Sequence, residues 1–239
     1  MKSAVSVDEN LTALPRLLPE GRIEEEPLPS AFHERFPVLL IGRRTQGTIW
    51  PDHSENAAAL ECYREGYKAF HEDQDAIAAM RAYEQALEHD PLYFRVWVEL
   101  AVVCLIDNTA ASIEKAEGIF ARLCCIEPDG EWLTREVASI LRQNLGYTRI
   151  VRYQRTGDRT YLELADTEYR LANALAEQER LELLCSWAYV KLERGEKESA
   201  ERLWERAVKA APSPATLAEF VGKFASLAVL WKQDSRVRP

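Results

Sequence analysis

The sequence predicts an all-α protein made of repeated helical hairpins, preceded by an extended amino-terminal arm. From about residue 56 onward, aromatic and alanine residues recur at three- and four-residue spacing, which is the period of an amphipathic helix. No run alternates polar and apolar residues with a period of two, as a half-buried strand would. One group of spaced positions also recurs along the chain, so we expect the helices to form similar pairs.

The clearest copy of this group lies near the carboxyl end of the chain. Ala200, Trp204 and Ala207 are separated by four and three residues, which places them on one face of a helix. Gly195 precedes this helix and Pro212 follows it, so both of its ends are marked. A face of small and large side chains in turn suits a helix that packs closely against another helix.

The same spacing occurs in two earlier segments. In every copy, the first alanine and the final proline are twelve residues apart. The two earlier copies are Ala79, Tyr83, Ala86, Pro91 and Ala116, Phe120, Leu123, Pro128. The helices before the three copies also match, with Tyr63-x2-Gly66-Tyr67-x2-Phe70, Trp97-x2-Leu100-Ala101-x2-Cys104 and Leu184-x2-Trp187-Ala188-x2-Lys191.

This pattern resembles the tetratricopeptide repeat (TPR) family, whose signature is Trp-x2-Leu-Gly-x2-Tyr, then Ala-x3-Phe, then Pro. The resemblance implies a right-handed superhelix of about four hairpins with a concave face lined by the first helix of each pair. It covers a repeat domain over residues 56–239, after an arm over residues 1–55. The expected hairpins are 56–91, 92–128, 130–180 and 181–212, with a cap over 213–232.

The third hairpin is expected to be larger than the others. We expect helices from Trp132 to Tyr153 and from Thr160 to Ala176, both about two turns longer than their counterparts. Gly146 is expected to kink or interrupt the first of them. After the fourth hairpin, the segment from Ser213 to Trp231 is expected to form one amphipathic helix that caps the array.

The arm differs in composition from the rest of the chain. Six of the eleven prolines lie before residue 55, which predicts an extended segment rather than a helical core. Within it, Val38–Ile41 and Thr48–Trp50 flank the turn GRRTQG and indicate a strand, a short hairpin or an extended segment on a helical surface. Because an isolated hairpin is only marginally stable, we expect docking on the protein's own body, with a partner as the alternative.

Composition favours a cytoplasmic protein that does not bind DNA nonspecifically. The net charge is −9, the five cysteines form no CxxC motif, and no apolar run is long enough to span a membrane. The amino terminus also lacks the apolar core of a signal peptide. We expect the adjacent Cys124 and Cys125 to be small packing residues, with a redox element as the alternative.

A search for catalytic motifs assigns no residue to chemistry. The sequence has no GxGxxG, GxxxxGK[ST] or GxSxG motif, and its four histidines do not fall at metal-ligand spacing with Cys, Asp or Glu. We therefore expect a non-enzymatic protein with no catalytic, cofactor-binding or metal-binding residues. We also expect no small-molecule ligand.

A basic segment between residues 135 and 159 contains six arginines and only two acidic residues, Glu136 and Asp158. We call the six the arginine strip: Arg135, Arg142, Arg149, Arg152, Arg155 and Arg159. These arginines either form ion pairs with neighbouring acidic helices or bind an acidic peptide, a carboxy terminus or RNA. The TPR resemblance and the strip together indicate partner-binding residues Arg64, Lys68, Arg95, Val102, Trp132, Arg135, Arg142, Arg149 and Arg152. The resemblance also places His71, Val98, Ser139 and Tyr189 on the concave face.

These features predict an adaptor or assembly chaperone that holds an acidic and apolar peptide of a protein partner in the concave face. One alternative is a structural subunit of a larger complex, attached through its amino-terminal arm. A weaker alternative is nucleic-acid binding through the arginine strip, which would give an affinity that falls steeply with salt.

Overall fold

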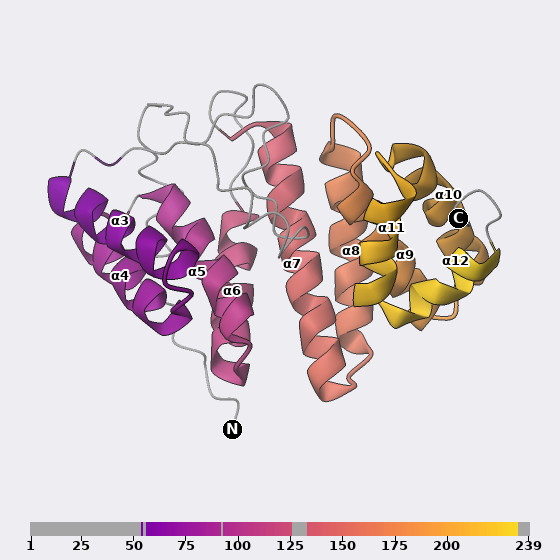
Figure 1. Cartoon of the computed structure of the whole chain (residues 1–239), viewed down its shortest axis with the longest axis horizontal. Helices are drawn as coiled ribbons and strands as arrows, with labels where there is room; N and C mark the ends of the chain where they lie inside the picture. The colour runs from indigo at the N-terminus through magenta and orange to yellow at the C-terminus, as the bar shows by residue number, and fades with distance from the viewer. Residues whose placement is uncertain (1–53, 55, 92, 126–132, 234–239) are drawn as a thin grey trace. The chain divides into compact units, whose positions relative to one another are not determined.

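The protein is helical in the part that the computed structural model describes, namely residue 54 and residues 56–91, 93–125 and 133–233 (Figure 1). These ranges contain ten α-helices and one short 3-10 helix but no strand, so the predicted all-α class is confirmed for them. None of the helices in these ranges is long and apolar enough to cross a lipid bilayer.

Several predicted features lie outside the described residues. These are the arm up to residue 53, with its segments Val38–Ile41 and Thr48–Trp50, and the candidate site residue Trp132. The docking of the arm on the body therefore stays a prediction. The right-handed superhelix stays a prediction as well.

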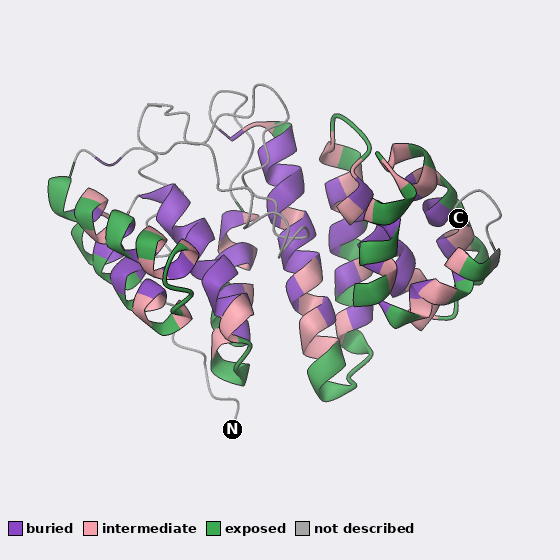
Figure 2. Cartoon of the chain, in the orientation of Figure 1, coloured by how far each residue is buried: buried purple, intermediate pink, exposed green. Residues whose placement is uncertain are grey.

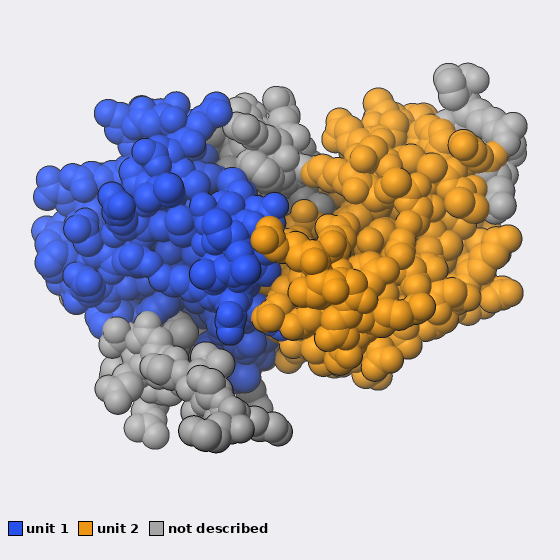
Figure 3. Space-filling view, turned by 90° about the horizontal axis from the view of Figure 1, so that it is seen from below, with its two compact units in different colours: residues 1–137 blue, residues 138–239 orange. Residues whose placement is uncertain are grey.

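The chain divides into two compact units, residues 1–137 and 138–239 (Figure 3). In the first unit, the helices pack in chain order, each against the next, so that they form two consecutive hairpins. These hairpins fall within the predicted ranges 56–91 and 92–128. Their helices are α3 (Ala57–His71), α4 (Ala76–His89), α5 (Phe94–Asp107) and α6 (Ala110–Leu123).

The first hairpin is fastened where its chain enters and leaves. The side-chain oxygen of Asn56 accepts hydrogen bonds from two backbone N–H groups in the first turn of α3, which caps the helix. The amide nitrogen of Asn56 donates to the carbonyl oxygen of His89, at the end of α4, over 2.8 Å. Beside it, the hydroxyl of Ser54 donates to the carboxylate of Asp90. Four residues thus tie the two ends of the hairpin together.

An aromatic ring lies directly on a glycine in the core of this hairpin. A Cβ atom added to Gly66 would lie 2.6 Å from the ring of Tyr83, which is fully buried and stacks against Tyr63 with ring centroids 6.0 Å apart. The missing side chain of Gly66 is therefore what lets α3 and α4 approach each other. Tyr83 fills the space above Gly66 between the two helices.

The second unit contains the remaining hairpins and the carboxy-terminal segment. Here α8 packs against α9 and α9 against α10, while the 3-10 helix η3 also packs against α9. The first residues of α7 belong to the first unit, because the boundary between the units falls inside this helix. The elements are α7 (Arg135–Thr156), α8 (Thr160–Leu175), α9 (Leu181–Glu193), α10 (Lys197–Ala210), α11 (Pro214–Lys223), η3 (Ala225–Leu227) and α12 (Ala228–Gln233).

Gly146 does not interrupt α7, so the predicted interruption of this helix is wrong, while the kink stays a prediction. The helix runs through Gly146 for 22 residues, and a Cβ atom at this position would lie 3.1 Å from the ring of Tyr169 on α8. Glycine is thus used again to bring two helices close together. Only α7 is about two turns longer than its counterparts, since α8 has 16 residues and α4 has 14.

The prediction of one helix from Ser213 to Trp231 is also wrong. The first helix ends at Lys223, and Phe224 leaves the helical region with φ −121° and ψ 87° before η3 begins. This break turns the chain so that Phe224, Leu227 and Leu230 are all buried, at 3%, 0% and 2% exposure. A continuous helix could not place these three side chains in the same positions.

Candidate functional site

Two of the predicted partner-binding residues, Arg64 and Lys68, lie on the exposed side of α3. They are one turn apart, and neither side chain makes a hydrogen bond or ion pair within the described part of the chain. Tyr67 and His71 lie beside them, half-buried, with ring centroids 4.1 Å apart. We call these four residues the α3 face. It combines two unpaired cations with two rings.

Arg95 and Val102 lie in the interior instead. α5 packs against both α4 and α6 and is buried on nearly all sides (Figure 2). The Nε atom of Arg95 lies 3.7 Å from a carboxylate oxygen of Glu99, and its guanidinium carbon lies 5.3 Å from the ring centroid of Tyr63. Val102 is 1% exposed, and Val98 is equally buried. These residues therefore contribute to packing within the first unit.

Two members of the arginine strip form ion pairs with one carboxylate. Arg142 and Arg149 each place an Nη1 atom 2.8 Å from a different oxygen of Glu168 on α8. Glu168 is only 8% exposed, and a buried carboxylate needs such partners to offset its lost hydration. For these two arginines, the structure shows the first of the two predicted interpretations, ion pairing with a neighbouring acidic helix.

Other arginines of the strip also contact their own unit. The guanidinium carbon of Arg152 lies 4.7 Å from the ring centroid of Tyr161, within the range of a cation–π interaction. Arg159 donates from Nη2 to the carbonyl oxygen of Glu193, at the end of α9, over 2.9 Å. Arg135, at the start of α7, is exposed. The strip is thus largely engaged within the protein.

Two residues that the resemblance placed on the concave face are buried in the second unit. The hydroxyl of Ser139 donates to the carbonyl oxygen of Ala172 and accepts from Nη2 of Arg180, both over 2.6 Å. Tyr189 is 6% exposed because the ring of Phe224 stacks on it, with centroids 4.6 Å apart and planes inclined by 25°. Ser139 therefore joins helices, and Tyr189 is covered by the carboxy-terminal segment.

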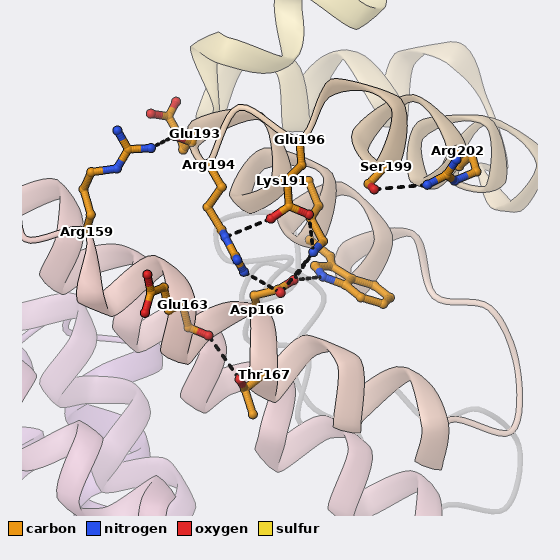
Figure 4. Close-up of polar contacts among 11 residues, drawn as sticks. Arg159, Glu163, Asp166, Thr167, Lys191, Glu193, Arg194, Glu196, Ser199 and Arg202 are labelled. Atoms are coloured by element: carbon orange, nitrogen blue, oxygen red, sulfur yellow. Dashed lines mark hydrogen bonds and ion pairs between the residues drawn. The ribbon is translucent and has the colours of Figure 1, made fainter.

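A charged network at the junction of α8, α9 and α10 was not predicted from the sequence (Figure 4). The carboxylate of Asp166 accepts hydrogen bonds from Nε1 of Trp187 over 2.7 Å and from Nη1 of Arg194 over 2.5 Å. It also lies 2.8 Å from Nζ of Lys191. Both cations also contact Glu196, at 2.8 and 3.0 Å. No motif relates these residues, since they come from α8, from α9 and from the turn between α9 and α10.

The surroundings of Asp166 favour its charged form. Burial alone would raise the pKa of this carboxyl group, but hydrogen bonds from Lys191 and Trp187 lower it. The positive charges of Lys191 and Arg194 lower it further, so the pKa lies below its ordinary value. Asp166 is therefore ionised at neutral pH and serves as an acceptor that links α8 to the end of α9, rather than as a proton donor.

The cysteines differ in their surroundings. Burial raises the pKa of the Cys104 thiol to about 12, so this thiol stays protonated and packs as a small apolar group. Cys124 is half-buried, whereas Cys125 is exposed, with its Sγ atom 3.3 Å from the carbonyl oxygen of Ala121. The predicted packing role therefore does not hold for Cys125. Over the described ranges, no group of three His, Cys, Asp or Glu residues could hold a metal ion.

The first unit also has a surface hollow of about 300 Å³ between α4 and α6. Ile77 at its edge is 54% exposed, and Lys115 and Glu84 form an ion pair across it. Such a hollow could hold one apolar side chain of a partner. Its lining residues are Ile77, Met80, Arg81, Glu84, Ala111, Ser112 and Lys115.

Comparison of the chain with protein-family models, with curated proteins and with solved structures finds no match. The functional argument therefore depends on the chemistry of the described residues. Among the predicted partner-binding residues, Arg64 and Lys68 are exposed and have no ion-pair partner in the described ranges, whereas Arg95, Arg142 and Arg149 have intramolecular partners.

Proposed function

We propose that the protein is a non-enzymatic, TPR-like adaptor that binds an acidic segment of a partner protein on the α3 face. The observation that supports this proposal most directly is the exposure of Arg64 and Lys68, which have no hydrogen-bond or ion-pair partner among the described residues. Arginine offers paired planar donors to a carboxylate, and lysine adds a second positive charge one turn away. The rings of Tyr67 and His71 supply an apolar surface beside these charges.

The energetic cost of binding favours this site over the arginine strip. An acidic partner can reach Arg64 and Lys68 without breaking an existing contact. Binding to Arg142 or Arg149 would instead compete with Glu168 and leave its buried carboxylate without a full set of partners. This competition leaves the proposal of nucleic-acid binding through the strip with weaker support.

The neighbouring charges restrict the partner further. Glu61 and Glu65 are also exposed on α3, so the face as a whole is not strongly basic. The Cβ atoms of helix residues four apart, such as Arg64 and Lys68, are separated by about 5–6 Å. A partner therefore needs carboxylates at a similar spacing, and apolar rather than acidic residues where it lies against Glu61 and Glu65. A generic polyanion does not meet this requirement.

The proposal is tested with the double substitution Arg64→Glu/Lys68→Glu. Arg202→Glu/Lys209→Glu is the matched control, because it makes the same charge change at two exposed positions on α10. Proteins that co-purify from the native host are identified by mass spectrometry with the wild-type chain and with both variants. We expect a set of partners that the α3 variant loses, that the control retains, and that is released by salt.

The opposite outcome is equally clear. If both variants retain the same partners as the wild type, while circular dichroism shows that they are folded, the α3 face is not the binding site. If the α3 variant does lose partners, a direct titration with the partner's acidic segment as a synthetic peptide measures the loss in affinity.

A second candidate function is that of a structural subunit, which the hollow between α4 and α6 favours. An exposed Ile77 beside an apolar depression suits a permanent contact with another subunit. Deletion of residues 1–53, which keeps Ser54 and Asn56, separates the two functions. The subunit function predicts loss of assembly, whereas the adaptor function predicts retained peptide binding. The Ile77→Asp variant, analysed by native mass spectrometry, tests whether the hollow takes part in assembly.

A further inference from the structure

Residues from α7 and α9 meet on one side of the second unit. Tyr189 and Glu193 are one turn apart on α9 and so share a face of that helix. The hydroxyl of Tyr153 on α7 donates to Oε2 of Glu193 over 3.1 Å, and Nε2 of Gln154 lies 3.5 Å from the hydroxyl oxygen of Tyr189. We call these four residues the α7–α9 face.

The chain's own carboxy-terminal segment lies on this face. The ring of Phe224 stacks on Tyr189 at 4.6 Å, and the hydroxyl of Ser226 donates to Oε1 of Glu193. Leu227 is fully buried next to them in the sequence. Each of the two α9 residues therefore contacts α7 on one side and the carboxy-terminal segment on the other.

The segment is held by contacts that a separate peptide could reproduce. Phe224 lies outside the helical region, between α11 and the 3-10 turn η3, and the six-residue α12 follows, so the two contacts come from a short stretch between helices. Tyr189 binds an aromatic ring by stacking, and the carboxylate of Glu193 accepts a hydrogen bond from a hydroxyl group. The two contacts are made by residues two positions apart in the sequence.

We propose that the α7–α9 face is a binding surface for short segments with an aromatic residue two positions before a serine or threonine. Phe224–Leu227 is its built-in occupant, and a partner segment of the same chemistry competes with it. The carboxylate of Glu193 selects against an acidic residue at the hydroxyl position, so this ligand differs from the acidic segment proposed for the α3 face.

Occupation by the built-in segment lowers the apparent affinity for a partner. The apparent dissociation constant equals the intrinsic one divided by the fraction of molecules whose face is vacant. Contacts farther along keep the segment close by, since Trp231 on α12 meets Trp204 on α10 edge to face at 6.3 Å. Weakening the segment's own contacts should therefore increase binding of an added peptide.

The test uses a fluorescein-labelled peptide of residues 221–232, VGKFASLAVLWK, titrated against the full chain with anisotropy as the readout. Ser226→Glu places a negative charge against Glu193, and Phe224→Ala removes the stacking ring. Ala218→Glu is the matched control, because it adds the same charge at an exposed position of α11. We expect both segment variants to bind the peptide at least about tenfold more tightly than the wild type and the control.

A peptide in which the phenylalanine is replaced by alanine should not bind any of these proteins. If neither segment variant binds the unaltered peptide while circular dichroism shows both to be folded, the proposal is overturned. Arg64→Glu/Lys68→Glu should leave the titration unchanged, which separates failure of this proposal from failure of the α3 face.

Hydrogen exchange of the wild-type chain covers the case in which the segment variants do not fold. We expect amides of residues 224–233 to exchange faster than those of α9 and α10, and an excess of the unlabelled peptide to accelerate them further. Equal protection of all three segments, with no effect of the peptide, would show that residues 224–233 are a fixed part of the core.

Discussion

Substitution of Gly66 by alanine tests how the first hairpin packs. The added methyl group would lie 2.6 Å from Cε1 of Tyr83, well inside van der Waals contact. The ring cannot move aside, because it is fully buried and stacked against Tyr63. Gly118 on α6 is the matched control, since a Cβ atom there meets no atom within 4 Å.

The expected change in stability follows from two opposing terms. Overpacking of a core costs about 1–3 kcal/mol, whereas alanine stabilises a helix by about 0.5–1 kcal/mol relative to glycine. Gly66→Ala should therefore lower the free energy of unfolding by about 0–2.5 kcal/mol. Gly118→Ala, which has only the favourable term, should raise it by about 0.5–1 kcal/mol.

Urea unfolding followed by far-ultraviolet circular dichroism measures both changes, provided that the variants share the same dependence on urea concentration. Gly146→Ala should fall between the two, because its Cβ atom would lie 3.1 Å from the ring of Tyr169. If Gly66→Ala is as stable as Gly118→Ala, Tyr83 does not fill the space above the glycine, and the interpretation of the hairpin core is refuted.

Three further predictions concern charge and reactivity. Glu168→Gln removes the carboxylate shared by two arginines and should lower the free energy of unfolding by about 3 kcal/mol, measured in urea. The pKa of Asp166 is lowered below 3.8 on folding, so its stabilising contribution is present above pH 3.8 and is lost as pH falls through the folded-state pKa. Unfolding measured over this acidic range should therefore depend less on pH in Asp166→Asn; an unchanged pH dependence would contradict the network in Figure 4. In the native protein, Cys125 should react with a thiol reagent much faster than Cys104, whose pKa is raised to about 12 by burial; equal rates would contradict the burial of Cys104.

Periodicity was sufficient to predict the helical hairpins. The spacing of Ala79, Tyr83 and Ala86 defines a face that is fully buried in the structure, and the prolines mark where hairpins end. These are local features, because a helix buries the residues that its own period places on one side. Arg64 and Lys68 were predicted from the TPR resemblance rather than from periodicity, and both lie exposed on α3.

Features that depend on contacts between distant residues were not predictable in the same way. The break at Phe224 depends on stacking against Tyr189, which no local pattern indicates. Only two acidic residues lie within the arginine strip in the sequence. In the structure, Glu168 on the next helix forms ion pairs with Arg142 and Arg149. The TPR resemblance predicts that Arg95 is exposed on the concave face. In the structure Arg95 is buried, because α5 packs against both α4 and α6.

The fastening of the first hairpin has a mechanical consequence. Asn56 and Ser54 connect the start of α3 to His89 and Asp90 at the end of α4. Tension applied at Ser54 and Asn56 would thus reach both helices at once through these bonds, instead of peeling α3 away one turn at a time. A tether pulled from that end should consequently detach the whole hairpin in a single step.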